Sequence, residues 1–295
     1  MIKRLRDKEL KIVAEIIRDY IFVPTYSRKT TVFLCGADKS DTKTGRYKMA
    51  ELFKNYPRYE LLYPEDLFDD LMAGQGQHSL FIIENILADS VDSIVLFPES
   101  PGSFAELGSF ASDRRLANKL ICIGQKKYAK RKSFINYGPV RLIKASDTGR
   151  VFNIVYDDLV DDDEKKKIYK RISDAITIIK KKYPIKQDVA NIMETENFVL
   201  PCIYLIDLIT ARELYKLVEL ATGQDKKIAE IATRSSLSRL IGKHHINRTT
   251  DGYAVTKQGM DCIKLSLSAT HLDAVRMEII NSQYRKNVMI KAVNF

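Results

Sequence analysis

The sequence contains no tryptophan, only four cysteines and no long uninterrupted apolar run. The lack of tryptophan excludes nothing, but a membrane-spanning helix needs about 18–20 consecutive apolar residues, so none is expected. The cysteines, at positions 35, 122, 202 and 262, lie far apart and lack the spacing of a metal site. They are expected to be reduced packing residues of a cytoplasmic protein that holds no metal.

The start of the chain, "MIKRLRDKELKIVAEIIRDYIF", is basic and interrupted by charges throughout. It therefore predicts an amphipathic helix rather than a signal peptide. The full length of 295 residues favours two domains. The net charge of +10 favours an anionic partner, although such an excess is also common on solvated surfaces.

Short apolar runs alternate with helical periodicity between residues 30 and 145. Strands are expected at 30–37, 59–67, 92–98 and 120–125, with helices at 45–56, 78–90 and 103–119. This alternation predicts an α/β domain with a Rossmann-like parallel sheet and flanking helices. In such sheets ligands bind beyond the carboxyl ends of the strands.

The pattern changes after residue 145. Residues 149–186 pass from acidic to lysine-rich and predict a connecting helical segment, and 187–222 are strongly helical. The apolar stretch 199–222 suits either a core or a subunit interface. Two helices separated by a serine-rich break, then two strands around an Asp-Gly turn, are expected within 225–267, which is a winged helix-turn-helix layout. The expected boundaries are 1–29, 30–148, 149–186 and 187–295.

Two glutamates mark the expected active site. Glu84 interrupts an apolar helical face, where a carboxylate is costly to bury without a partner. Glu106 follows the turn "PESPGS" and is expected in the first turn of its helix, near free N–H groups and a positive dipole end. Taken singly, Glu84 could reach the surface, and Glu106 could form a capping box with Ser103. Their placement beside the same strand favours a shared role.

Other polar and small residues are expected to line the same pocket. Gly102 permits close backbone approach, and the two serines of the turn can bind hydroxyls or phosphate. Residues near the other strand ends could hold hydroxyls or phosphates as well. The complete expected set of substrate-binding residues is Gly36, Asp66, His78, Ser100, Gly102, Ser103, Asn136 and Tyr137.

The segment "VDSIVLFPESPGSFAELGSFA" resembles the signature of the nucleoside 2-deoxyribosyltransferase superfamily. That resemblance implies that Glu106 is the nucleophile and that Glu84 positions the base or sugar. Ser100 stands where the superfamily usually has an aspartate. The match is closer to bacterial retron-associated effectors, through "VFLCGA", "YPEDLFDDLMAGQGQHSL", "KRKSFINYGPVRLI", "LPCIYLIDL" and "TDGYAVTKQG". In those proteins a deoxyribosyltransferase-like domain precedes a winged helix.

This resemblance implies an antiphage toxin that a complex of reverse transcriptase and its covalent RNA–DNA product, the msDNA, holds in check. It also implies cleavage of an N-glycosidic bond, with NAD+ as substrate rather than cofactor, and a homo-oligomer. Such cleavage passes through an oxocarbenium-like state that a carboxylate stabilises or captures. Nicotinamide leaves NAD+ as a neutral molecule, so Ser100 in place of an aspartate is tolerable.

The second expected helix of the winged-helix layout carries a modest basic set: Arg239, Lys243, His244 and His245. These residues suit phosphate contact better than base reading, which favours docking to the reverse transcriptase–msDNA complex. Two other functions stay open. One is a glycosidase or transferase acting on nucleosides or nucleotides, and the other is a ligand-sensing regulator that binds DNA through its winged helix.

Overall fold

The computed structural model describes residues 4–24, 29–65, 86, 90–266 and 269–284, which fall into two compact units. The α/β unit contains the described residues between 29 and 186. The helical unit contains residues 4–24 together with the described residues from 187 onward. The α/β unit thus extends to residue 186 instead of ending at 148, and the N-terminal residues join the C-terminal part instead of standing apart.

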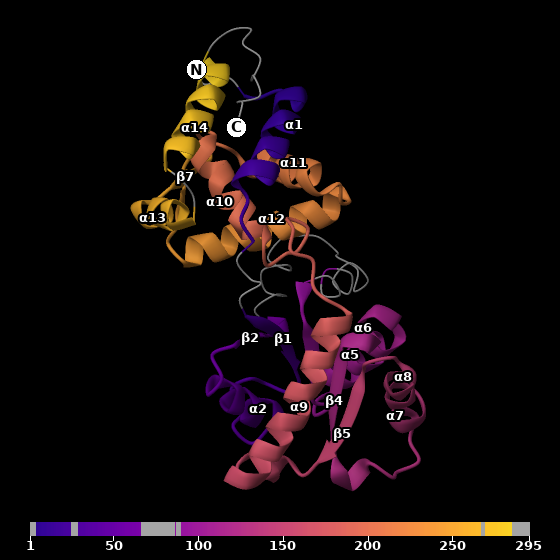
Figure 1. The fold of residues 1–295 in the computed structure, drawn as a ribbon. Coiled ribbons are helices and arrows are strands. Elements are labelled where there is room, and N and C mark those ends of the chain that lie inside the picture. Colours follow the sequence, from indigo (N-terminus) through magenta and orange to yellow (C-terminus); the bar gives the residue numbers. More distant parts are fainter. Residues whose placement is uncertain (1–3, 25–28, 66–85, 87–89, 267–268, 285–295) are drawn as a thin grey trace. The chain divides into compact units, whose positions relative to one another are not determined.

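A five-stranded parallel sheet forms the centre of the α/β unit (Figure 1). Its strands are β1 (Thr30–Cys35), β2 (Tyr59–Leu62), β3 (Ser93–Leu96), β4 (Leu120–Gln125) and β5 (Arg150–Ile154). They lie in the order β2-β1-β3-β4-β5, with every neighbouring pair parallel. The Rossmann-like sheet and its first four strands are confirmed, whereas β5 lies in the segment expected to be a connector. The chain reverses its direction of winding between β1 and β3, which is where such sheets bind ligands.

Helices cover both faces of this sheet (Figure 1). They are α2 (Gly45–Lys54), α5 (Pro101–Ser112), α6 (Arg114–Lys119), α7 (Phe134–Tyr137), α8 (Pro139–Ala145) and α9 (Asp162–Lys182), with 3-10 turns η3 (Lys126–Tyr128) and η4 (Tyr156–Leu159). Apolar residues of α2 and α9 share one core with Val32, Leu34 and Val95. On the other face Phe110 of α5 contacts Phe33 edge to face.

The helix expected at 103–119 is two helices, because Asp113 interrupts it. The Asp113 carboxylate accepts hydrogen bonds from the backbone N–H groups of Arg115 and Leu116, and thereby caps the start of α6. The expected helix at 78–90 lies almost entirely outside the described residues.

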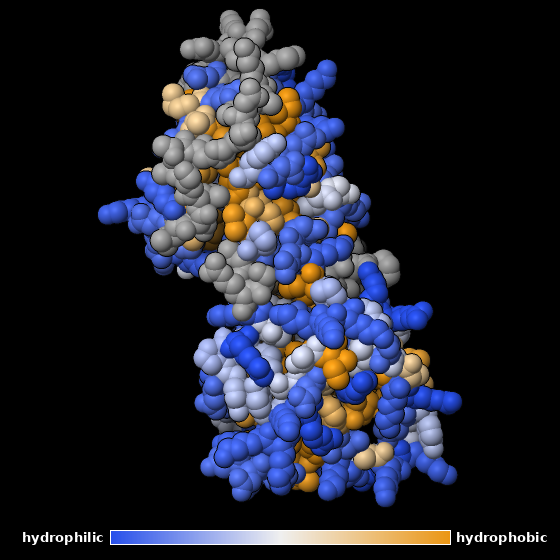
Figure 2. All heavy atoms as spheres, in the orientation of Figure 1, coloured by the Kyte–Doolittle hydropathy of each residue, from blue (hydrophilic) through white to orange (hydrophobic). Residues whose placement is uncertain are grey.

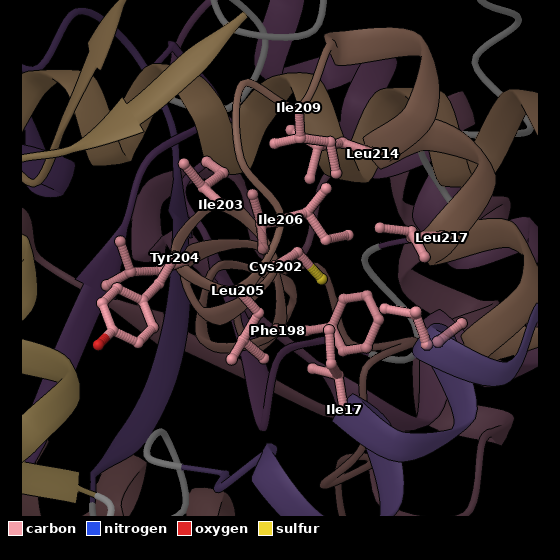
Figure 3. Packing of buried hydrophobic residues seen from close by; sticks show 14 of the residues in the cluster. Ile17, Phe198, Cys202, Ile203, Tyr204, Leu205, Ile206, Ile209, Leu214 and Leu217 are labelled. Carbon is pink, nitrogen blue, oxygen red and sulfur yellow. The ribbon is translucent and has the colours of Figure 1, made fainter. Parts of the chain in front are cut away.

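The helical unit is built around α10. Its elements are α1 (Asp7–Ile16), the π-helical turn η1 (Ile17–Ile21), α10 (Thr195–Leu205), α11 (Ala211–Thr222), α12 (Lys226–Gly242), β6 (Ile246–Arg248), β7 (Tyr253–Val255), α13 (Lys257–Ser266) and α14 (Ala269–Tyr284). Figure 3 shows Phe198 and Cys202 of α10 packed near Ile17 and Leu217. The apolar stretch 199–222 is therefore core: the chain itself buries the face that could have served as a subunit interface.

The order of elements from α10 to β7 is that of a winged helix. An isolated antiparallel bridge joins Ile209, between α10 and α11, to Tyr253 of the β6–β7 hairpin. The hairpin around Asp251-Gly252 is confirmed, but the serine-rich break is wrong, since α12 is continuous from Lys226 to Gly242.

Candidate active site

Glu106 lies on α5, the helix that follows β3 at the point where the sheet reverses its winding. The helix begins at Pro101 with Ser100 as its N-cap, so Glu106 is in the second turn and not in the first. Ser100 and Ser103 form the capping box between them. The alternative role of Glu106, as the capping-box partner of Ser103, is therefore wrong, and its carboxylate is left for another purpose.

The Glu106 carboxylate is largely shielded from water. Within the described part of the chain, its buried oxygen Oε2 has no hydrogen-bond partner. Burial raises the pKa of Glu106 to about 7, an effect that the positive charge of Arg46 opposes and the negative charge of Glu65 reinforces. A buried polar atom without a partner is costly, and acids with perturbed pKa values gather at functional sites.

Arg46 of α2 supplies the fixed positive charge of the site. Its side chain is 1% exposed and forms a two-pronged pair with Glu65, with Nη1–Oε1 2.7 Å and Nη2–Oε2 2.6 Å. Nη1 also donates to the carbonyl of Ala37 at 2.6 Å. Gly36 makes room for this side chain, because a Cβ atom at Gly36 would lie 2.7 Å from the Arg46 Cβ. The structure thus assigns Gly36 to packing at the end of β1.

The hydroxyl of Ser103 serves the backbone of the turn rather than a ligand. It accepts hydrogen bonds from the N–H groups of Glu99 and Ser100 at 2.9 and 2.8 Å, and only 1% of the residue is exposed. The Ser100 hydroxyl accepts from the N–H of Ser103 at 3.2 Å and reaches the carbonyl of Gly36 at 3.4 Å. Gly102 is exposed, and an added Cβ there would meet only the Ser100 hydroxyl, at 4.0 Å.

Glu99 is a second carboxylate at this strand end. Burial raises its pKa to about 7, against the lowering effect of the backbone N–H groups of Gly45 and Arg46. Its Oε1 accepts from the Arg46 N–H at 3.2 Å, so Glu99 caps the start of α2. The turn that carries Ser100 is in this way tied to the helix that carries Arg46.

Asn136 lines a separate cavity of about 290 Å³ beside the carboxyl ends of β4 and β5. Its side-chain amide donates to the carbonyls of Tyr128 and Arg131 at 3.0 and 2.7 Å, which holds that loop in place. Phe104 of α5 and Pro98 also line this cavity, whereas Glu106 does not. The Tyr137 side chain is 60% exposed. Neither Asn136 nor Tyr137 contacts the Glu106 carboxylate among the contacts of the described residues.

Three expected site residues, Asp66, His78 and Glu84, lie outside the described residues. Within the described part, no group of His, Cys, Asp or Glu side chains could hold a metal ion.

None of the described helices combines the length and apolar composition that crossing a membrane requires. Figure 2 shows hydrophilic residues over much of one face, with hydrophobic residues scattered among them.

Comparison with known proteins identifies the family of this chain. Residues 42–248 match the model of the STM3845 retron effector protein family. The chain belongs to this family. It is 42% identical over 265 residues, covering 88% of this chain and 86% of the other, to the Escherichia coli "Retron Ec86 putative ribosyltransferase/DNA-binding protein". It is 36% identical over 121 residues, 39% of this chain and 38% of the other, to the corresponding "Retron Ec73" protein of the same species.

Sequence reasoning about this retron effector missed three charged residues of the site: Arg46, Glu65 and Glu99. Signals for them exist. Arg46 falls on the apolar stripe of its helix with Met49 and Phe53, which are buried like it. Glu65 and Glu99 each follow a strand of the parallel sheet. Carboxylates at those positions meet at one edge of the sheet.

The basic set of α12 is largely engaged inside the retron effector itself. Arg239 Nε lies 3.1 Å from Glu196 Oε2, and its Nη2 donates to the carbonyl of Ile192 at 2.8 Å. Lys243 Nζ contacts the other Glu196 oxygen at 2.7 Å. His244 is exposed just beyond the end of α12, and His245 is half-buried. Arg239 and Lys243 thus both pair with Glu196 within the fold, and phosphate contact by Lys243 would compete with that pair.

We therefore expect Arg239→Gln to lower the free energy of unfolding by about 2 kcal/mol, because it removes a cation beside buried Glu196 and a hydrogen bond to the carbonyl of Ile192. Urea unfolding at neutral pH would measure the loss. The exposed Arg212 of α11 offers the control Arg212→Gln, which should change stability by less than about 0.5 kcal/mol. Equal stability of the two variants would contradict the assignment.

Proposed function

We propose that this retron effector is an N-glycosidase toxin of antiphage defence that cleaves the nicotinamide–ribose bond of NAD+. Glu106 acts as the nucleophile, and Glu84 positions the base or sugar. A reverse transcriptase–msDNA complex holds the toxin inactive. The name of the Ec86 relative, "putative ribosyltransferase/DNA-binding protein", supports the reaction class, and membership in the retron effector family supports the partner.

The observation that carries the proposal is the unpartnered, buried oxygen of Glu106. Cleavage of a ribosyl–nitrogen bond develops positive charge on the sugar ring, which a nearby carboxylate stabilises or captures as a covalent intermediate. An oxygen that makes no hydrogen bond keeps its lone pairs available for the anomeric carbon of a substrate that enters the site. Arg46 lies close enough to favour the ionised form of Glu106, while its own pairing with Glu65 keeps it in place.

The choice of NAD+ rests on the leaving group. Nicotinamide departs as a neutral molecule, so its release needs little help from a general acid. Ser100 fits that requirement, since it stands where the superfamily has an aspartate and its hydroxyl is already used to cap α5. A purine or pyrimidine leaving group would gain more from an acid at this position.

NAD+, nicotinamide and nucleosides measured in extracts of cells that express the chain alone would test the function. We expect NAD+ to fall and free nicotinamide to rise, with nucleoside pools unchanged, and co-expression of the retron reverse transcriptase and its RNA should prevent the loss. Steady NAD+ with falling nucleosides or nucleotides would favour the transferase-like alternative. Stable pools together with binding to a specific promoter would favour the ligand-sensing regulator.

The pH dependence of the reaction offers a second test. Because burial raises the pKa of Glu106 to about 7, the ionised nucleophile is the minor form below that pH. We expect kcat/KM to rise about tenfold per pH unit below pH 7 and to level off above it. A profile that falls as pH rises through 7 would assign Glu106 the opposite role, that of a protonated acid.

A further inference from the structure

A basic and aromatic surface lies on the α/β unit at the end of β4. The chain from residue 120 to 146 contains no aspartate or glutamate and carries seven basic residues, all exposed. They are Lys126, Lys127, Lys130, Arg131, Lys132, Arg141 and Lys144. Three aromatic residues between them are exposed as well, Tyr128 by 46%, Phe134 by 85% and Tyr137 by 60%. We call residues 126–144 the basic-aromatic surface.

Its charge is not neutralised within the described part of the chain, where none of the seven basic side chains pairs with a carboxylate. The lysine-rich helix α9 differs in this respect, because Lys165 and Lys167 pair there with Asp162 and Glu164. Paired charges of that kind are typical of a solvated helix face. A cluster of basic side chains without carboxylate partners is instead typical of a surface that binds an anionic partner.

The surface is also held in shape. The Asn136 amide fixes the carbonyls of Tyr128 and Arg131. The Tyr128 ring contacts two cations, with Lys127 Nζ 4.9 Å and Arg131 Cζ 4.7 Å from its centroid. The cavity of about 290 Å³ opens beside the same residues and is lined mainly by apolar groups. A partner would therefore meet fixed charges, exposed ring faces and a recess.

We propose that the basic-aromatic surface binds single-stranded nucleic acid. Proteins that bind single strands combine a basic surface along the phosphates with aromatic rings on which unpaired bases stack. The bases of a duplex are already stacked, so exposed rings such as Phe134 add affinity only for a single strand. A membrane surface is the less fitting partner, because it calls for a long amphipathic helix, whereas α7 and α8 have four and seven residues.

The test is binding of the full-length protein to a fluorescent oligo(dT) of about twenty nucleotides, followed by anisotropy at several salt concentrations. We expect Lys127→Gln/Lys130→Gln/Lys132→Gln to weaken binding at least tenfold at low salt. The slope of log K against log salt should become shallower by about 2, at about 0.7 for each lost phosphate contact. The control Lys166→Gln/Lys170→Gln/Lys181→Gln changes exposed lysines of α9 and should bind as the native protein does.

Stacking is tested separately with Phe134→Ala, which should weaken binding about five- to tenfold without changing the salt slope. Ile178→Ala, at a position 47% exposed on α9, is its control. A second charge variant, Arg141→Gln/Lys144→Gln, covers the case in which the first does not fold. The proposal is overturned if the charge variants bind oligo(dT) like the native protein, if Phe134→Ala has no effect, or if anionic vesicles or a duplex of equal length bind more tightly than the single strand.

Discussion

Replacing Glu106 with glutamine is expected to lower NAD+ cleavage by at least about a thousandfold, which corresponds to about 4 kcal/mol of lost transition-state stabilisation. Glutamine keeps the size of the side chain but cannot carry the negative charge that the developing cation needs. Because the Glu106 carboxylate does not cap α5, the helix should form as before. Nicotinamide release by the purified variant measures the effect.

The matched control is Glu51→Gln, which changes an exposed glutamate of α2 that pairs with nearby Lys54. We expect full activity from the Glu51→Gln variant.

The Glu106→Gln variant should also be more stable than Glu51→Gln at pH 8. Burial raises the pKa of Glu106, so the ionised carboxylate destabilises the native state above the unfolded pKa of about 4.5, and glutamine removes that cost. Retained activity in Glu106→Gln would end its assignment as the nucleophile.

Glu65→Gln is expected to lower the free energy of unfolding by about 2–3 kcal/mol. It leaves the guanidinium of Arg46, which is 1% exposed, without its carboxylate. Removal of one partner from a fully buried pair costs about 3–5 kcal/mol, and the smaller value applies because the Glu65 side chain is 42% exposed. Urea unfolding at pH 7 would measure the difference.

The effect should depend on pH with a definite sign. The hydrogen bond from Arg46 lowers the pKa of Glu65, so the stabilisation is present above the unfolded pKa of about 4.5 and is lost as pH falls through the folded pKa. Glu164→Gln breaks an exposed pair with Lys167 and should cost less than about 1 kcal/mol. A Glu65 variant no less stable than this control would show that the buried pair does not hold the site together.

The sheet was predictable from the sequence where its strands are fully buried. The runs that became β1, β3 and β4 are almost wholly apolar, and a parallel sheet covered on both faces requires that. Both edge strands are only partly buried: β2 was still recognised from its run YELL, whereas polar residues toward both ends of β5 hid it. Its residues Arg150 and Asn153 keep contact with water, so the segment lacks the apolar run of a central strand.

The break expected in α12 was wrong for a different reason. Serine and threonine favour turns when their hydroxyls compete with the helix for backbone groups. Here the hydroxyls of Thr233 and Ser236 donate to the carbonyls one turn earlier, of Ala229 and Ala232, at 2.7 and 2.8 Å. The helix therefore continues through buried polar residues, and only its neighbours α10 and α11 explain why they are buried.

For the candidate active site, the sequence pointed to Glu106 through its turn and helix, whereas the cation beside it, Arg46, was missed. Arg46 becomes part of the site by pairing with Glu65 and by packing against Gly36, and both contacts join different elements of the fold. Ser103 was assigned to a ligand because a hydroxyl in a turn can serve either partner. Only the positions of the Glu99 and Ser100 N–H groups decide in favour of the backbone.

The first helix of the chain packs into a core made mostly of residues 187 onward, and this has a consequence for synthesis on the ribosome. At about 5–20 residues per second, α1 leaves the ribosome roughly ten to forty seconds before α10. The α/β unit can fold in that interval. The apolar side chains of α1, such as Leu10 and Val13, stay exposed to water until the residues that bury them have been synthesised. A chain interrupted before residue 187 would thus carry a complete parallel sheet and an unburied amphipathic helix.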